Sequence, residues 1–95
     1  MPAYVILDID VKDPRLYEEY KKQGAPTLAV YGGKPLVRGG SVKVQEGTWD
    51  PKRVVIIEFP SMDQAQRWWD SAEYAQAKKL RHRAAQTNVV FIEGL

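Results

Sequence analysis

Arg38 and Glu58 are the two side chains whose chemistry stands out, because each is a charge on a segment otherwise dominated by apolar residues. If the chain turns near Trp49, the two fall close to one another on paired strands. The functional hypothesis is a polar anchor with two catalytic residues in an apolar pocket, in which Arg38 holds an anionic or carbonyl oxygen and Glu58 accepts or moves a proton. The alternative is a structural ion pair near the end of the sheet. A bulge at Gly39-Gly40 would decide whether the two share a face.

Aromatic residues at helical spacing supply the candidate walls of such a pocket. Trp68 and Trp69 are separated by about 100° on a helix, so only one of them can face the sheet squarely. Core packing alone explains this pattern, and contact of Tyr20, Trp69 and Tyr74 with a ligand is the functional hypothesis. Arg81 follows Tyr74 by seven residues and shares its helix face, which would place Arg81 at the mouth of the pocket.

A basic run from Lys78 to Arg83 contains the only histidine, His82. A basic cluster near a helix end complements the negative end of the helix dipole and stays solvated. No aromatic platform or groove-reading motif accompanies it, so we predict no nucleic-acid binding. His82 is expected to be exposed, with a role as general base as the weaker alternative.

Asp8 and Asp10 place two carboxylates on one strand face, an arrangement that a hard cation can use. No histidine stands near them in the sequence, which favours solvated carboxylates and predicts no metal site. The chain also lacks a phosphate-cradling or dinucleotide-binding glycine pattern. We therefore expect no bound cofactor.

The length of 95 residues predicts one domain over residues 1–95 with a modest core. A chain of this size buries about 60 to 65 per cent of the surface that the unfolded chain exposes. Cysteine is absent, which excludes disulfides and thiolate metal sites, and the net charge of +2 is too small to argue for nucleic acid. There is no signal-like start and no apolar run that could span a bilayer, so we predict no membrane partner and a cytoplasmic location.

The first strand and helix are predicted from pattern and capping. Period-two alternation over Ala3 to Val11 indicates a strand with one apolar and one mixed face. Asp13 as N-cap and Pro14 at the first helical position then begin a helix that is expected to run to Tyr31. Pro26 should weaken or kink the middle of this helix.

The middle of the chain is predicted as a hairpin. Leu36 to Glu46 alternates less cleanly and is the expected second strand, bent at Gly39-Gly40. Gly47 to Pro51 supplies a turn, and Arg53 to Phe59 returns as a third strand antiparallel to the second.

The rest of the chain completes the fold. Ser61 with Gln64 three residues later resembles a capping box, and Ser71 begins a re-aimed helical segment that continues to Ala84. Asn88 to Glu93 is the expected last strand. The order β, α, β, β, α, β predicts an α+β protein of the ferredoxin-like type with a four-stranded antiparallel sheet.

The third strand predicts a homodimer. Val54 and Ile56 point away from Val55 and Ile57, so both faces of the strand are apolar. Two helices cover only one face of a four-stranded sheet. Sheet-to-sheet packing of a second copy is the most economical cover for the other face.

Several short motifs together resemble the small bacterial family called domain of unknown function 1330. They are VRGG at 37–40, VVIIEFPSM at 54–62, WWDSAEY at 68–74, Arg81 and the terminal Glu93-Gly94, and the resemblance covers nearly the whole chain. The family pattern is matched at these positions: Arg38, Gly39, Gly40, Glu58, Tyr74 and Arg81. Ala72 stands where the family commonly has proline, which affects how sharply the helix is re-aimed.

The resemblance implies a branch of the dimeric α+β barrel superfamily, with a ferredoxin-like protomer and sheet-to-sheet dimers. Proteins of this superfamily include cofactor-free monooxygenases, isomerases, haem proteins and ligand-sensing domains, so the fold does not choose an activity. Haem is disfavoured because His82 lies in a basic, exposed stretch.

Two hypotheses about function follow. The first is a homodimeric domain with an apolar pocket for a small organic molecule that bears a carbonyl or carboxylate, and its catalytic form is a cofactor-independent monooxygenase or isomerase. The second is a non-catalytic ligand-sensing or assembly domain in which the Arg38–Glu58 pair only orders the sheet.

Overall fold

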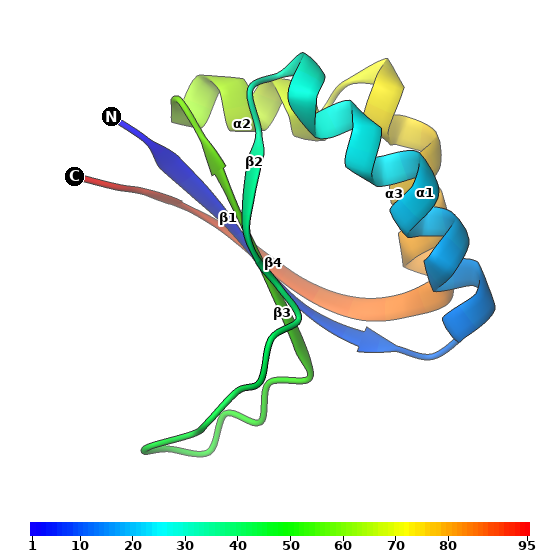
Figure 1. Cartoon of the computed structure of the whole chain (residues 1–95), viewed down its shortest axis with the longest axis vertical. Helices are drawn as coiled ribbons and strands as arrows, with labels where there is room; N and C mark the ends of the chain where they lie inside the picture. The colour runs from blue at the N-terminus through cyan, green and yellow to red at the C-terminus, as the bar shows by residue number, and fades with distance from the viewer.

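The structure is a computed structural model that describes all of residues 1–95. Its elements are β1 (Ala3–Val11), α1 (Pro14–Val30), β2 (Lys34–Arg38), β3 (Arg53–Phe59), α2 (Met62–Trp69), α3 (Ala72–Ala84) and β4 (Ala85–Glu93). They form a four-stranded antiparallel sheet in the order β2-β3-β1-β4 (Figure 1). The predicted βαββαβ arrangement is confirmed.

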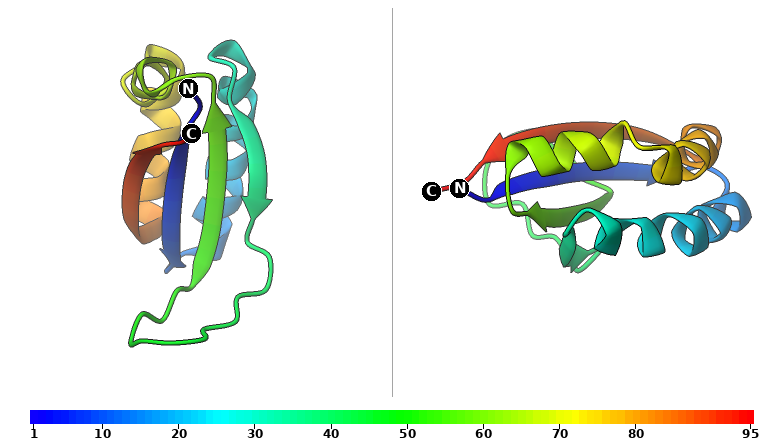
Figure 2. Two further views of the ribbon diagram at one scale, coloured as in Figure 1. Left: turned by 90° about the vertical axis from the view of Figure 1, so that its left-hand side faces the viewer. Right: turned by 90° about the horizontal axis from the view of Figure 1, so that it is seen from above.

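The helices cover one face of the sheet and leave the other open. The left view of Figure 2 shows the open face toward the viewer, with the helices behind the sheet. The alternation of β1 explains this arrangement, because Val5, Leu7 and Ile9 are at most 1% exposed beneath the helices. Ile6, between them in sequence, points to the open face and is half-buried. The core therefore lies in a single layer between sheet and helices.

Side-chain caps set the helix ends as the sequence predicts. The Leu16 amide donates to Asp13 Oδ1 at 3.1 Å, and Ser71 Oγ accepts from the Tyr74 amide at 3.1 Å, where α3 begins in a new direction. Pro26 does not end α1, which continues to Val30.

The capping box at α2 forms only in part. Ser61 Oγ accepts from the Gln64 amide at 3.1 Å, but the Gln64 side chain donates to the Tyr31 carbonyl at 3.0 Å rather than returning to Ser61. Gln64 thereby ties the end of α1 to the start of α2.

The second strand is the largest departure from the sequence prediction. β2 ends at Arg38 instead of Glu46, and residues 39–52 form an exposed connection, here called the β2–β3 arm, that runs away from the helices (Figure 1). Alternation alone predicted a longer strand, but the arm has no strand beside it with which to pair. β4 begins three residues earlier than predicted, at Ala85.

The irregularity in β2 lies earlier than predicted. Pro35 is opposite Ile57 and Val37 is opposite Ile56, so Leu36 is the extra residue of a β-bulge. Gly39 follows the strand with a φ of 71°, and a Cβ there would collide with the guanidinium group of Arg53. The glycine pair therefore marks a close approach and not the bulge.

Replacing Gly39 with alanine should lower the free energy of unfolding by about 1 kcal/mol, because its φ lies in the left-handed region that disfavours a Cβ. Urea unfolding of both proteins measures the difference. Gly40→Ala is the matched control, since a Cβ at Gly40 meets nothing within 4 Å. Equal losses in the two variants would contradict this account of Gly39.

Candidate functional site

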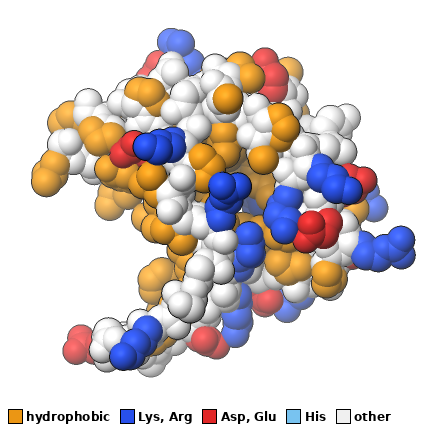
Figure 3. All heavy atoms as spheres, viewed as in Figure 1, with side chains coloured by type: hydrophobic (Ala, Val, Ile, Leu, Met, Phe, Trp, Pro, Cys, Tyr) orange, Lys and Arg blue, Asp and Glu red, His pale blue; other side chains and the backbone are white.

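The candidate site is a cavity of about 330 Å³ between α1 and the β2–β3 edge of the sheet. Figure 3 shows it as a hollow with hydrophobic side chains in its depth and Lys and Arg side chains at its rim. Its floor consists of sheet residues that alternate toward the helices, including Leu7, Val55 and Ile57. Its volume lies at the lower end of the range typical of small-molecule pockets, about 300–1,000 Å³.

The helix side of the cavity follows from the spacing of α1. Tyr17, Tyr20, Gly24 and Leu28 recur at three- and four-residue intervals and all border the cavity. Gly24 carries no side chain, and a Cβ there would lie 3.4 Å from the Tyr20 ring and 3.7 Å from the Ala77 Cβ, so the glycine permits close packing of α1 against α3. Hydrophobic periodicity along α1 therefore creates this wall of the cavity.

Trp68 forms the inner end of the cavity and is 1% exposed. Its indole N–H donates to Thr27 Oγ1 at 2.9 Å, and the Thr27 hydroxyl donates in turn to the Gly24 carbonyl at 2.6 Å. A buried indole N–H needs such an acceptor, which fixes the orientation of the ring.

Three cations stand at the rim: Lys21, Arg38 and Arg53. Arg53 Nε donates to the Tyr17 hydroxyl at 3.0 Å, and its guanidinium carbon lies 5.6 Å from the centre of the Tyr17 ring. Lys21 pairs with Glu18 at 2.9 Å, whereas neither arginine has a carboxylate within ion-pair distance. The rim therefore offers two guanidinium groups that form no ion pair.

Arg38 and Glu58 do not form the predicted pair. Arg38 lies opposite Val55 and borders the cavity on the helix side, whereas Glu58 lies opposite Tyr4 and Lys34. The extra residue at Leu36 reverses the parity of β2, so the two charges point to opposite faces of the sheet. The prediction of one Arg–Glu anchor is wrong for this reason.

Glu58 has its own surroundings on the open face. Partial desolvation, followed by the hydrogen bond and charge of Glu58, raises the pKa of the Tyr4 phenol. The carboxylate is thus placed beside a neutral phenol and away from the cavity.

The other predicted ligand-binding residues gather behind the cavity. The Tyr20 and Tyr74 hydroxyls are 2.9 Å apart, and Arg81 Nε donates to the Tyr74 hydroxyl at 3.4 Å. The Trp69 ring packs against Tyr74 at 6.0 Å and Arg81 at 5.4 Å. Only Tyr20 of this group borders the cavity.

Arg81 is not at the mouth, contrary to the prediction, because it is only 2% exposed. The seven-residue spacing places Arg81 on the helix face of Tyr74, as predicted, but that face is buried beside Trp69 and does not open at the cavity mouth. Its neighbour His82 is exposed, as predicted. Desolvation and the charges of Arg81 and Lys78 lower the pKa of His82.

Sequence reasoning missed Tyr17, Lys21 and Arg53. Arg53 has the same parity as Val55 and Ile57, and Tyr17 precedes Tyr20 by three residues, so strand alternation and helix spacing contained both signals. Neither signal indicates that the space between the Tyr17 and Arg53 side chains is open.

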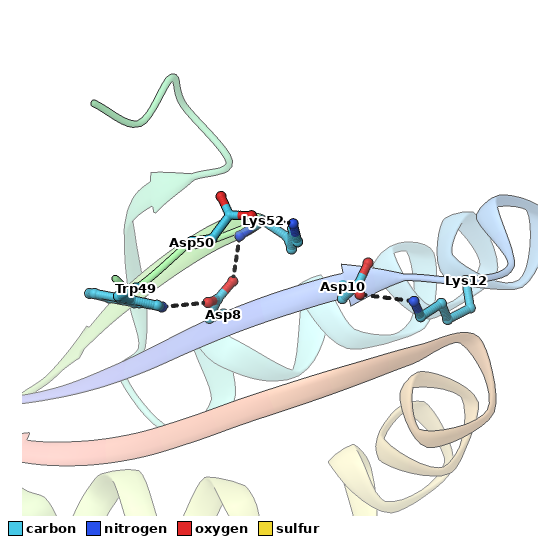
Figure 4. Close-up of polar contacts among 6 residues, drawn as sticks. All are labelled: Asp8, Asp10, Lys12, Trp49, Asp50 and Lys52. Atoms are coloured by element: carbon cyan, nitrogen blue, oxygen red, sulfur yellow. Dashed lines mark hydrogen bonds and ion pairs between the residues drawn. The ribbon is translucent and has the colours of Figure 1, made fainter. Parts of the chain in front are cut away.

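The two aspartates of β1 have protein partners instead of a metal-like arrangement (Figure 4). Asp8 accepts from Trp49 Nε1 at 2.9 Å and from the Lys52 amide at 2.8 Å, while Asp10 pairs with Lys12 at 2.9 Å. Asp8 thereby fastens the base of the β2–β3 arm to the open face of the sheet.

The βαββαβ order, the antiparallel sheet and the helices on one face define a ferredoxin-like α+β protein. The chain belongs to the family described as Domain of unknown function (DUF1330), whose model matches residues 2–95. Curated proteins yield no match by sequence. None of the helices has the length and apolar character needed to cross a membrane.

Solved structures share the fold at low sequence identity. A protein of unknown function from Rhodopseudomonas palustris is similar with a TM-score of 0.79 and 19% identity, over 99% of this chain and 82% of that one. SnoaB, a cofactor-independent oxygenase from Streptomyces nogalater, is similar with a TM-score of 0.73 and 12% identity, over 99% of this chain and 93% of that one. A dimeric ferredoxin-like protein of unknown function from Jannaschia sp. is similar with a TM-score of 0.67 and 8% identity, over 99% of this chain and 100% of that one.

Thr27→Val should lower the free energy of unfolding by about 1–3 kcal/mol, because it leaves the buried Trp68 N–H without an acceptor. Denaturant unfolding provides the measurement. Thr27→Ser keeps the hydroxyl and serves as the control, with a smaller expected loss. A valine variant as stable as the serine variant would show that the Trp68–Thr27 bond does not hold the inner wall.

Proposed function

We propose that residues 1–95 form one domain that binds a small organic anion in the cavity between α1 and the β2–β3 edge. The observation that carries this proposal is an apolar cavity whose rim holds two guanidinium groups that form no ion pair. An aromatic or aliphatic body would fill the interior, while Arg38 and Arg53 would hold a carboxylate, phenolate or enolate oxygen. The cytoplasmic location stays a prediction from the sequence.

The lining favours binding over general acid–base catalysis. Its titratable members are Tyr17, Tyr20, Lys21, Arg38 and Arg53, and it contains neither a carboxylate nor a histidine. Glu58, the predicted base, lies on the other face of the sheet. A ligand-binding or ligand-sensing role is therefore the function that the geometry supports best.

A cofactor-independent oxygenase is the second candidate. The fold similarity to SnoaB makes it a reasonable alternative, although similarity at 12% identity carries the fold alone. In this chain the catalytic contribution would be stabilisation of negative charge on a substrate oxygen by arginine and tyrosine donors. Turnover would then depend on Arg38 and Tyr20.

4-Nitrophenol is a suitable probe because its phenolate is coloured and its ring is small enough for the cavity. Arg38→Gln and Arg53→Gln should each weaken phenolate binding by about two- to fivefold, the effect of a partly solvated charge pair. Equilibrium dialysis with absorbance detection at alkaline pH measures the affinity.

The matched control is Arg67→Gln, which removes one positive charge from α2, where Arg67 pairs with Asp63 at 3.0 Å. This variant should bind the phenolate as the unmodified protein does. Absence of binding, or equal losses in all three variants, would count against the proposed site.

We propose, in addition, that the domain is a homodimer through the open face of the sheet. Ile6, Ile56, Val90 and Ile92 form an apolar surface there, with Val90 57% and Ile92 54% exposed in the single chain. The β2–β3 arm adds exposed valines, Val42 and Val44, and extends to the same side (Figure 1). A second copy would cover a surface that monomers seldom leave exposed.

Ile56→Lys should convert the dimer to a monomer, because it places a charge in the middle of the open face. Native mass spectrometry reports the assembly directly. Val30→Lys, at an exposed position at the end of α1, is the control and should leave the dimer intact. A monomeric unmodified protein, or a dimeric Ile56→Lys variant, would contradict the proposed interface.

A further inference from the structure

Arg81 is a buried cation without an anion. It is 2% exposed, it forms no ion pair, and its Nη2 atom makes no hydrogen bond. Its hydrogen bond is the one from Nε to the Tyr74 hydroxyl, and the Trp69 ring lies 5.4 Å from its guanidinium carbon. Burial of an uncompensated charge is costly in free energy. The hydrogen bond from Arg81 to Tyr74 is therefore an important compensation for the buried guanidinium.

The hydrogen-bond chemistry gives this contact a direction. A guanidinium group has only donors, so the Tyr74 oxygen accepts from Arg81. The positive charge favours the orientation in which the Tyr74 proton points away from it, toward the Tyr20 oxygen 2.9 Å away. The Tyr20 proton is then free for another acceptor, and Tyr20 borders the cavity.

Tyr20 is kept in its neutral, donating form. Burial is the largest cause that raises the pKa of the Tyr20 phenol well above its usual range. The group therefore remains a proton-bearing donor across the physiological range and does not act as a base.

We infer that Arg81 acts on the cavity through Tyr74 and makes the Tyr20 hydroxyl a strengthened donor to an oxyanion of the bound molecule. This inference rests on the binding function proposed above and adds a preference for ligands whose oxygen is ionised, such as phenolates and enolates. Tyr20 contacts the ligand, and Tyr74 and Arg81 are positioning residues. Hydrogen bonds in such a chain polarise one another, which strengthens the terminal donor.

The ionisation of bound 4-nitrophenol tests the inference. Titration of the bound probe by its absorbance gives its pKa in the cavity. Lys21, Arg38 and Arg53 at the rim and the Tyr17 hydroxyl also face the probe, and their influence is common to the variants compared. Differences among those variants therefore isolate the Tyr20–Tyr74–Arg81 chain.

Tyr74→Phe is the decisive variant because it interrupts the chain and retains the ring that packs 4.1 Å from Trp68. The pKa of the bound probe should rise by about half to one unit, equivalent to about a three- to tenfold loss of preference for phenolate over phenol. Tyr20→Phe should raise it at least as much. Tyr31→Phe is the control, since Tyr31 donates to Glu73 at the surface and lies outside the cavity.

The outcomes separate the two proposals. A bound probe whose pKa is the same in the Tyr74→Phe and unmodified proteins overturns the inference, even where Tyr20→Phe changes it, because Arg81 would then have only a structural role. A probe that does not bind the unmodified protein overturns the proposed function itself. Loss of stability in Tyr74→Phe without a change in the probe's pKa also overturns the inference.

Discussion

The β-bulge at Leu36 is the constraint on which the arrangement of this molecule depends. Side chains alternate along a strand, so one extra residue moves every later side chain to the other face. With the bulge, Arg38 lies opposite Val55 on the neighbouring strand and borders the cavity at its rim. Without it, Arg38 would lie on the open face with Glu58, and the cavity would lose one of its two unpaired guanidinium groups. The charge of the site is therefore set by backbone register and not by proximity in sequence.

The two faces of the sheet consequently have different roles. The helix face supplies the core and the cavity, one wall of which follows the periodicity of α1. The open face supplies an apolar surface to which Asp8 fastens the β2–β3 arm through Trp49 and Lys52. The proposed ligand site on one side and the proposed association surface on the other would explain why both faces of β3 are apolar. Arg38 and Glu58 are separated by the sheet, because they lie on its opposite faces.

Local signals predicted most of the fold. Strand alternation located β1 and β3, and Asp13, Ser61 and Ser71 located the helix starts, because caps and periodicity are properties of neighbouring residues. The length of β2 and its bulge were not predictable, since they depend on whether a partner strand is present.

The site was predicted only in part for the same reason: Tyr20 and Arg38 border the cavity, but Arg81 is buried behind it. Which side of a helix a residue of a basic run occupies is decided by tertiary packing, here against Trp69 and Tyr74.

Binding of a small organic anion in the cavity beside α1 can be tested directly by heteronuclear NMR. The isotopically labelled protein is titrated with 4-nitrophenolate, and the backbone amide signals are recorded at each step. The largest saturable changes in backbone amide chemical shift should occur around Tyr20, Gly24 and Arg53, which border the cavity. Changes confined to the open face around Ile6 and Val90, or no saturable change, would contradict binding in the cavity.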